Sequence, residues 1–281
     1  MTVANHRDDL RALSLPRRLA ANLETAYRLL RMPARRPAPF APQWSRTTLA
    51  AAGIGVVALI LFVMAVFDSP TIRAVHDLPH WIVWPFDQIT DFGKSGWFLF
   101  PFGILFLVLA AAPPDLPAPV QRVLTAIAVR VGFLFAAVAV PGLVNTVIKH
   151  VIGRARPFVT GVADPFAFHP FVWKASYASM PSGHVTTVFS VLVAIGSLWP
   201  QTRSVLWIYA LLIAASRVMV LAHHPSDLVF GAVLGAGGAL VVRHYFAVRR
   251  LGFVIAPDGG IERLPAPSLR RIKAVARALL S

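Results

Sequence analysis

The sequence predicts an all-α integral membrane protein with six transmembrane helices, and three observations lead to this fold class. Of the 281 residues, 57% are hydrophobic and only 14% are charged, whereas a soluble domain carries about a quarter charged residues. The apolar residues are gathered into blocks long enough to cross a bilayer, for which roughly 20 residues are needed. The net charge of +15 is concentrated toward the two ends of the chain, as expected where Lys and Arg flank membrane spans on the cytoplasmic side.

Six apolar runs are the expected membrane spans. They cover residues 47–67, 95–112, 124–148, 183–200, 204–222 and 226–242. The first run starts too far along the chain and is too long for the apolar segment of a signal peptide, so we expect it to remain as an uncleaved anchor. No internal repeat is evident, although such a repeat is the usual sequence hint of an inverted-repeat transporter.

The spans divide the chain into a basic cytoplasmic arm at 1–46, a six-helix domain at 47–247 and a basic cytoplasmic tail at 248–281. Leucines at helical spacing in the arm are consistent with an amphipathic helix on the lipid surface or with a partly disordered arm, and the sequence leaves both open. The proline-rich stretch 33–42 predicts an extended linker. Apolar and basic residues alternate over 269–279 in a way that predicts a second surface helix.

The orientation follows from the number of spans and from the basic residues. Six spans place both termini on one side, and Arg203, Arg243 and the basic ends indicate that this side is the cytoplasm. The loops at 68–94, 150–182 and 217–225 then face outward. We therefore expect a multi-pass protein of the cell membrane, with both termini cytoplasmic and with its polar loops in the periplasm if the source is bacterial.

The composition excludes several classes of function. The chain has no cysteine, which excludes a disulfide framework and thiol chemistry. A basic chain can bind nucleic acid, but here the positive charge flanks membrane spans, so we expect no nucleic-acid partner. The outer polar clusters contain no group of carboxylates, so we expect no metal ion and no other cofactor. Asp258-Gly259-Gly260 in the tail predicts a turn rather than a metal-binding loop.

Three polar clusters fall on the expected outer side, and the first consists of Lys149, Arg154 and Arg156. These cations break the positive-inside pattern, and anion binding is one reason to find them there. Lys149 and Arg156 are seven residues apart and can share one helix face. Gly153 and Pro157 predict that the helix ends between them, which leaves the side chains free to converge. Cations that snorkel from the end of a span would give the same pattern.

The second cluster is Pro181-Ser182-Gly183-His184, immediately before an apolar run. Serine is a favoured helix cap, and the N-terminus of a helix presents free N–H groups to an anion. His184 then lies in the first turn and points into the same space. A plain helix cap beside an incidental interfacial histidine is the other interpretation.

The third cluster contains Arg217, His223 and Asp227. Proline is tolerated in the first turn of a helix, so the last span is expected to begin at Pro225, with His223 just outside it and Asp227 just inside. A carboxylate that holds one ring nitrogen makes the other nitrogen a better base or nucleophile. Arg217 can reach the same outer mouth. Alternatively, His223 and His224 simply line the membrane interface.

Together the three clusters resemble the signature of the type 2 phosphatidic acid phosphatase family in both order and spacing. The matching motifs are Lys149-x6-Arg156-Pro157, Pro181-Ser182-Gly183-His184 and Ser216-Arg217-x5-His223-x3-Asp227. The resemblance covers residues 149–227 and, through the six-helix topology, most of 47–247. It implies a membrane enzyme whose active site faces outward and which removes phosphate from a lipid phosphate or diphosphate without a metal ion.

The resemblance implies a role for each signature residue. His223 resembles the nucleophile that becomes a phosphohistidine, Asp227 its orienting partner, and His184 the general acid that later activates water. The residues expected to bind the phosphoryl oxygens are Lys149, Arg156, Ser182, Gly183 and Arg217. Arg154 and His224 are not signature positions, and the resemblance implies no role for them.

The substrate class expected from the resemblance is a lipid phosphate or diphosphate at the outer leaflet. Relatives act on phosphatidic acid, phosphatidylglycerophosphate, undecaprenyl diphosphate and lipid A phosphates, and no motif selects among these. Aromatic residues of the outer loop are expected at headgroup depth, where they anchor the loop or guide a lipid. They are Phe158, Phe166, Phe168, Phe171, Trp173 and Tyr177. Lys94 is expected to add a headgroup contact.

Two other functions are compatible with parts of the pattern. A vanadium-dependent haloperoxidase would hold vanadate in the same kind of pocket, but such relatives are soluble, unlike a chain with six spans. A non-enzymatic transporter or binding protein would continue its polar residues through the membrane, whereas the runs 47–67 and 95–112 carry no charge.

Overall fold

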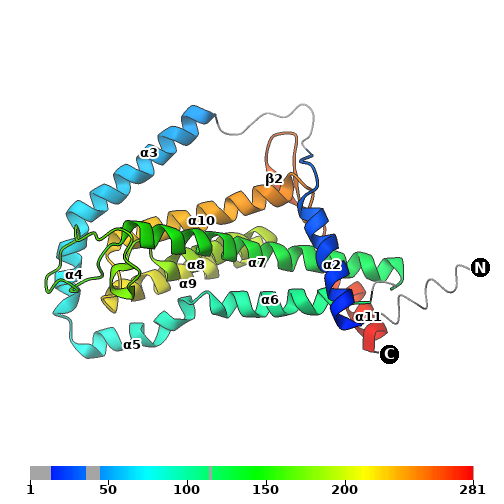
Figure 1. The fold of residues 1–281 in the computed structure, drawn as a ribbon, viewed down its shortest axis with the longest axis horizontal. Coiled ribbons are helices and arrows are strands. Elements are labelled where there is room, and N and C mark those ends of the chain that lie inside the picture. The colour runs from blue at the N-terminus through cyan, green and yellow to red at the C-terminus, as the bar shows by residue number, and fades with distance from the viewer. Residues whose placement is uncertain (1–13, 36–44, 114–115, 281) are drawn as a thin grey trace, which may run out of the picture. The chain divides into compact units, whose positions relative to one another are not determined.

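The computed structural model describes residues 14–35, 45–113 and 116–280 and consists mostly of helices (Figure 1). The chain forms two compact units. The first contains Met1–Gln43, Phe100–Phe135 and Arg243–Ser281, and the second contains Trp44–Leu99 and Ala136–Val242. The predicted boundaries at 46/47 and 247/248 stay a prediction.

The α-helices account for most of the described chain. They are α2 (Leu15–Leu30), α3 (Arg46–Val63), α4 (Ser69–His76), α5 (His80–Thr90), α6 (Gly96–Ala110), α7 (Ala118–Ile152), α8 (Gly183–Leu198), α9 (Arg203–Met219), α10 (Pro225–Ala247) and α11 (Leu269–Leu280). A π-helical stretch, η1 (Met64–Asp68), joins α3 to α4. Three single 3₁₀ turns are η2 (Asp91–Gly93), η3 (Ala175–Tyr177) and η4 (Pro200–Thr202). The strands are β1 (Phe253–Ile255) and β2 (Ile261–Arg263).

The protein is an all-α membrane protein, and five helical runs of the described residues are long and apolar enough to span a bilayer. They are Arg46–His76, His80–Ala110, Ala118–Ile152, Pro200–Met219 and Pro225–Ala247. The predicted fourth span, 183–200, corresponds to α8, which has only 16 residues. Most of α8 is buried inside its unit, so other helices rather than lipid surround it. The count of six spans therefore stays a prediction.

The second unit is built around α8, which packs mainly against α9. Val185, Val188 and Ile213 are at the centre of this contact. α10 passes very close to α8 because two of its residues are glycines. A Cβ at Gly231 would lie 2.7 Å from the carbonyl oxygen of Ser182, and one at Gly235 would lie 2.2 Å from that of Thr186. This close approach holds the beginnings of α8 and α10 together.

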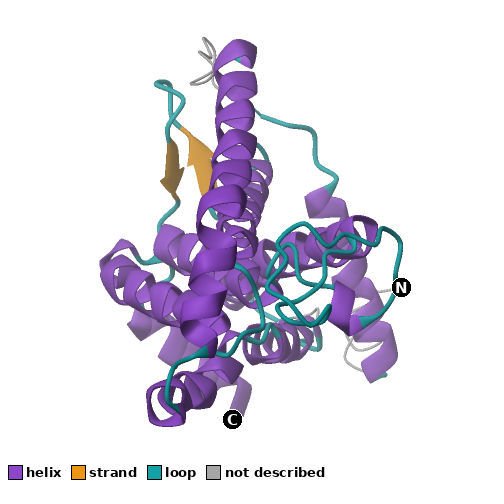
Figure 2. Cartoon of the chain, turned by 90° about the vertical axis from the view of Figure 1, so that its left-hand side faces the viewer, coloured by secondary structure: helices purple, strands orange, loops and turns teal. Residues whose placement is uncertain are grey.

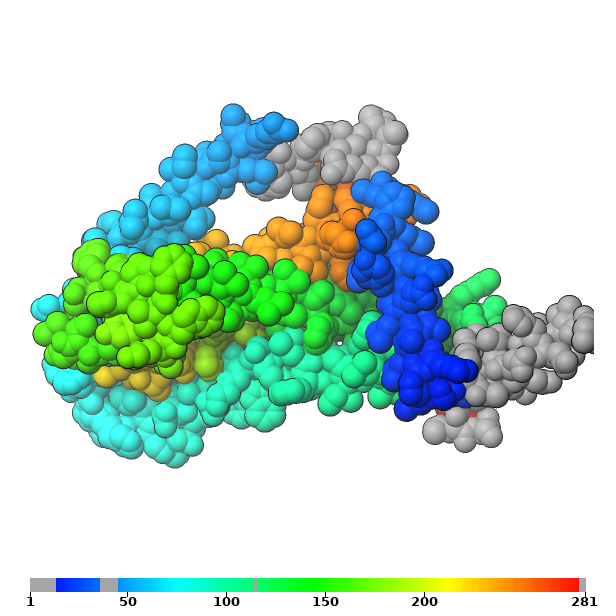
Figure 3. Space-filling model, viewed as in Figure 1, coloured from blue at the N-terminus to red at the C-terminus, as the bar shows by residue number. Residues whose placement is uncertain are grey.

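α3 is the least covered helix of this unit. Only Ile60 among its residues is buried, and Figure 3 shows its side chains uncovered along the face in view. An apolar helix with this exposure is expected to face lipid. Ser45 caps the helix by accepting a hydrogen bond from the Thr48 backbone N–H at 3.0 Å.

The first unit contains the short hairpin of β1 and β2, drawn as two arrows in Figure 2. The turn expected at Asp258-Gly259-Gly260 is confirmed, since the Gly260 N–H donates to Asp258 Oδ1 at 2.8 Å and Gly259 has φ of +85°. Phe133 packs edge-on against Phe246 and Phe253. Strands of only three residues show too little alternation of apolar and polar side chains for the sequence to predict them.

Several expectations for the segments between spans can now be compared with the structure. The predicted loop at 68–94 is largely helical, because α4 and α5 occupy most of it. The arm forms α2 over Leu15–Leu30, and α11 lies where the second surface helix is expected. The arm before residue 14 and most of the predicted linker 33–42 lie outside the described residues.

Candidate active site

All three signature clusters lie in the second unit, each at the end or the beginning of a helix. The first cluster spans the end of α7 and the segment after it, the second lies at the start of α8, and the third lies between α9 and α10. Helix ends leave backbone groups without partners inside the helix and so suit polar ligands.

Gly153 ends α7 and turns the chain toward the site. It has φ of +60°, and a Cβ there would lie 1.7 Å from the carbonyl oxygen of His169, so only glycine fits. After the turn, the Ala155 N–H donates to Ala167 and the Arg156 N–H to Ser176, at 2.9 and 2.8 Å. These bonds fix the segment that carries Arg154 and Arg156.

Ser182 precedes α8 in the cap position that the sequence predicts, but its hydroxyl makes no capping hydrogen bond. Instead Ser182 is tied down through its backbone, whose N–H donates to the Asp227 carbonyl oxygen at 3.0 Å. Its Oγ is buried and has no hydrogen-bond partner among the described residues. Gly183 begins the helix, and a Cβ there would lie 3.5 Å from Lys149 Nζ.

The third cluster is held by a turn between α9 and α10. The Arg217 carbonyl oxygen accepts from the N–H groups of Ala222 and His223 at 3.1 and 3.2 Å, and Leu221 adopts a positive φ of 51°. α10 begins at Pro225, as expected from the sequence. Asp227 therefore lies in the first turn of α10, and His223 lies just before it.

Three cations converge at this place from three different elements. Lys149 lies within electrostatic range of both Arg156 and Arg217. Arg217 is only 7% exposed, and its Nη1 donates to the Thr90 hydroxyl, which fixes the guanidinium from α5. Burial lowers the pKa of Arg156, and the charge of Asp227 opposes this shift. Like charges gathered in a partly buried space disfavour one another, and a bound anion would offset this repulsion.

Several buried polar atoms near these cations have no partner among the described residues. They are Oγ of Ser182, Nε of Arg156, Nε of Arg217, Nε2 of His184 and Nδ1 of His223. Buried donors are nearly always hydrogen-bonded in folded proteins, so a concentration of unpaired ones indicates a ligand site. Most of these groups are donors, which is the arrangement that suits an oxyanion.

His223 and His224 are equally distant from Asp227 but differ in access. The Nδ1 atoms of both rings lie 3.6 Å from Asp227 Oδ2, too long for a hydrogen bond. His223 is 2% exposed and His224 is fully buried, so both rings are nearly closed off and His223 is slightly the more accessible. Burial lowers the pKa of His223 to about 4, although Asp227 acts in the opposite direction. The imidazole is therefore neutral near pH 7.

Asp227 is held by groups outside the signature. Its Oδ1 accepts from Nη1 of Arg154 at 2.5 Å, and its Oδ2 accepts from the Ser179 hydroxyl at 2.6 Å and from the His224 N–H at 2.9 Å. Arg154, which the resemblance leaves without a role, is fully buried and also pairs with Asp68 at 2.6 Å. Asp68 is a carboxylate at the end of an uncharged span, which is a sequence signal of function.

Other supporting residues carry no sequence signal. Thr90 fixes Arg217, and the Asn145 amide donates to the Pro181 carbonyl oxygen at 3.2 Å and to the Thr186 hydroxyl at 2.9 Å. Lys94, expected at a headgroup, is exposed and pairs with Asp91 at 2.7 Å. No group of three or more His, Asp or Glu side chains within the described part of the chain is arranged to hold a metal ion.

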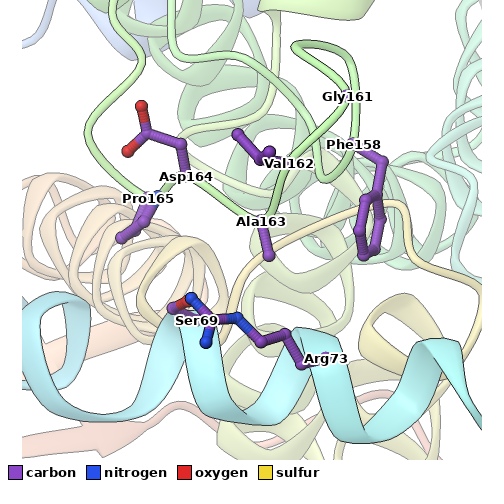
Figure 4. Close-up of a pocket in the computed structure, with 8 residues that line it drawn as sticks. All are labelled: Ser69, Arg73, Phe158, Gly161, Val162, Ala163, Asp164 and Pro165. Carbon is purple, nitrogen blue, oxygen red and sulfur yellow. The ribbon is translucent and has the colours of Figure 1, made fainter.

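A separate cavity of about 540 Å³ opens beside α4 (Figure 4). Its lining residues are Ser69, Arg73, Phe158, Gly161, Val162, Ala163, Asp164 and Pro165. None of them belongs to the signature. The buried unpaired donors, rather than this cavity, therefore locate the candidate active site.

Comparisons with known proteins agree with the resemblance. The family model described as PAP2 superfamily matches residues 130–251. Lipid A 1-phosphatase of Rhizobium johnstonii is 32% identical over 201 residues, which cover 71% of this chain and 82% of the relative. Lipid A 1-phosphatase of Rhizobium etli is 32% identical over 197 residues, 70% of this chain and 84% of the relative. Among solved structures, LpxE of Aquifex aeolicus has a TM-score of 0.46 at 18% identity and covers 63% of this chain and 95% of its own.

Proposed function

This chain belongs to the PAP2 superfamily and is a phosphatase, and on that premise we propose that it hydrolyses a lipid phosphate or diphosphate at the outer leaflet through a phosphohistidine on His223. The observation that supports this best is the set of buried donors without partners among the described residues. Oγ of Ser182 and Nε of Arg156 and Arg217 lie in one unit, with Lys149 beside Gly183, where a phosphoryl group would complete their hydrogen bonds.

In the first step, a lone pair of neutral His223 forms a bond to phosphorus while the bond from phosphorus to the lipid oxygen breaks. His184, at the first turn of α8, donates a proton to that leaving oxygen. Burial and the charge of Arg217 lower the pKa of His184 to about 3 without substrate, so the bound phosphate must raise it for this step. Asp227, 3.6 Å from Nδ1 of His223, stabilises the positive charge that develops on the ring. The charge on the three equatorial oxygens is carried by Lys149, Arg156, Arg217, Ser182 and the Gly183 N–H.

In the second step, water attacks the phosphohistidine. His184, which now lacks its proton, accepts one from the water as the new bond to phosphorus forms. The bond from phosphorus to His223 breaks, and inorganic phosphate leaves. Three cations and a helix N-terminus supply the charge stabilisation that other phosphatases obtain from a metal ion, so the reaction proceeds without one.

The substrate that we propose first is the phosphate at the position named by the two Rhizobium relatives, on a lipid A-type headgroup. Exposed aromatic side chains support a site at the membrane surface. Phe171 is 72% exposed and Trp173 is 76% exposed, as expected for a loop at headgroup depth.

The proposal is tested by phosphate release from a lipid panel in detergent, with the purified chain compared with its His223→Ala and His184→Ala variants. The panel contains a lipid A phosphate, phosphatidic acid, phosphatidylglycerophosphate and undecaprenyl diphosphate. We expect both variants to lose turnover and remain folded. His150→Ala is the matched control, because His150 lies outside the signature and stacks on Trp173 with ring centroids 4.1 Å apart. Full turnover in His223→Ala would refute the assignment.

Two further measurements test the mechanism. Brief reaction with a lipid labelled in its phosphate should transfer the label to the wild-type chain and not to His223→Ala. Turnover should persist with a chelator present; loss of turnover on chelation, with recovery on adding magnesium, would show that a metal ion takes part. The outer orientation is tested with a membrane-impermeant substrate added to sealed vesicles of known sidedness.

A further inference from the structure

Asp68, Arg154 and Asp227 form a buried ionic group beside the candidate active site. They come from η1, from the segment after α7 and from α10, and all three are 0% exposed. The Arg154 guanidinium lies between the two carboxylates, at 2.6 Å from Asp68 Oδ2 and 2.5 Å from Asp227 Oδ1. Isolated charges are very costly to bury, so this group is stable only as a unit.

Arg154 uses all of its donor groups within this arrangement. Besides the two carboxylates, Nη1 donates to the Ser226 hydroxyl at 2.7 Å, and Nε and Nη2 donate to the Pro165 carbonyl oxygen at 3.0 and 2.8 Å. The planar guanidinium carries five N–H donors in a fixed fork, so its direction is set completely. Its backbone is fixed as well, because the Arg154 carbonyl oxygen accepts from the Ser179 N–H at 3.1 Å.

Asp68 is bound as tightly on its side. Its Oδ1 accepts from the Ser226 N–H at 2.9 Å, and its Oδ2 accepts from the Ser226 hydroxyl at 2.6 Å. The Ser226 hydroxyl thus donates to Asp68 while it accepts from Arg154. Ser226 precedes Asp227 in the first turn of α10, so Asp68 holds this turn both directly and through Arg154.

This arrangement sets which oxygen of Asp227 faces the histidine. Arg154 occupies Oδ1, while Oδ2 is 3.6 Å from Nδ1 of His223. Oδ2 also accepts from the Ser179 hydroxyl at 2.6 Å and the His224 N–H at 2.9 Å, so loss of the guanidinium would leave the carboxylate held through Oδ2 alone and freer to shift. No hydrogen bond holds Nδ1 of His223 among the residues that the structure describes, and Asp227 Oδ2, 3.6 Å away, is a carboxylate oxygen near enough to act on it through its charge.

We propose that Asp68 and Arg154 are positioning residues for the reaction, which fix the Asp227 carboxylate in the place from which it orients His223. This rests on the proposed function, in which His223 attacks phosphorus. Neither residue touches the substrate; each acts through Asp227. The ionic group also connects η1, which follows the exposed helix α3, to the start of α10.

The test uses steady-state kinetics of Asp68→Asn in detergent, since asparagine keeps the shape and removes the charge. We expect kcat to fall about tenfold to a hundredfold, with KM within about twofold, because residues of one hydrogen-bonded network are strongly coupled. Asp77→Asn is the control, because it removes a carboxylate of α4's C-cap that is 81% exposed. Its kcat and KM should be unchanged.

A double-mutant cycle separates positioning from a merely structural role. In an Asp227→Asn background, Asp68→Asn should have no further effect on kcat, because it acts only through that carboxylate. Equal fold-losses of kcat in both backgrounds would overturn the proposal. So would a lowered unfolding midpoint with the kcat of the folded fraction unchanged.

Ser226→Ala is the second variant, in case Asp68→Asn does not fold. It removes only the hydroxyl that bridges Asp68 and Arg154 beside their direct ion pair, and kcat should again fall, by less than in Asp68→Asn, with KM retained. Unchanged kcat in this folded variant would count against the positioning role. The two proposals fail separately: full activity in His223→Ala refutes the proposed function, whereas an inactive His223→Ala beside normal kcat in Asp68→Asn and Ser226→Ala refutes only the positioning role.

Discussion

Two arginines of one short segment, Arg154 and Arg156, differ in how completely the protein satisfies their hydrogen-bond donors. Arg154 is fully buried and directs every donor group to a partner. Arg156 is two residues further along, and its buried Nε has no partner among the described residues. The hydrogen bonds of one arginine are therefore fully satisfied within the protein, and those of the other are not.

The two surroundings also differ in charge. Arg154 lies between two carboxylates, so its group carries an excess of negative charge, whereas Arg156 is gathered with Lys149 and Arg217. A folded chain tolerates the second arrangement only where a ligand compensates for it. The saturated hydrogen bonding of Arg154 suits a cation that supports the structure, and the unpaired Nε of Arg156 suits the phosphate-binding role proposed for it.

The largest effect is expected on stability when Arg154 is removed. Arg154→Ala leaves Asp68 and Asp227 buried without their cation, and breaking a buried ion pair in this way costs about 3–5 kcal/mol. Arg154→Lys, which keeps the charge but loses the fork, should cost less. Thermal unfolding in detergent measures both. An unfolding midpoint for Arg154→Ala equal to that of the wild type would contradict the comparison.

Removal of Arg156 should instead lower activity and leave the fold intact. Arg156→Gln removes one positively charged donor from the phosphoryl group, and loss of one such donor lowers kcat/KM by about 10²–10³. The unfolding midpoint should stay the same or rise, because one of three like charges is gone. Saturating inorganic phosphate should raise the midpoint of the wild type more than that of the variant. A variant as active as the wild type would show that Arg156 binds no substrate.

The next prediction concerns pH and distinguishes His223 from an ordinary histidine. With its pKa lowered to about 4 by burial, His223 is about nine-tenths neutral at pH 5, whereas an unperturbed histidine with a pKa of about 6.5 would be about 3% neutral. Protonation removes the attacking lone pair, so activity should be retained as pH falls from 7 to 5 and lost through about pH 4.

The measurement is kcat/KM against pH with two substrates whose phosphates ionise differently. A step that moves with the substrate belongs to the phosphate, and one that stays belongs to the enzyme. A fixed step near pH 6.5 would show that His223 is not desolvated as the structure indicates.

The sequence predicts the signature residues of the site but not the residues that support them. The signature residues lie at fixed short spacings on helix ends, so motif and helix rules are enough to place His223, Pro225 and Asp227. The assignment of their chemical roles remains a proposal. Motif spacing also distinguishes His223 from His224, and the difference in exposure agrees with it.

The supporting network could not be predicted, because it joins residues far apart in the chain. Asp68 bonds to Arg154 across 86 positions and to Ser226 across 158. Hydropathy places Asp68 at the edge of a span but cannot supply its partner. Nor could composition foresee that the loop at 68–94 is largely helical or that α8 is short, since burial by neighbouring helices determines how much apolar length a helix needs.

The smallest effects sharpen the comparison at two serines. Ser182→Ala removes a hydroxyl that has no partner among the described residues, so stability should be unchanged, while kcat/KM falls about tenfold or less, the equivalent of one neutral hydrogen bond. Ser179→Ala breaks a 2.6 Å bond to Asp227, which should lower the unfolding midpoint and kcat but leave KM alone. The measurements are the unfolding midpoint and the steady-state kinetics of each of the two variants. If Ser182→Ala were the less stable of the two, an unpaired buried donor would not mark the substrate site, and the contrast between Arg154 and Arg156 would lose its functional meaning.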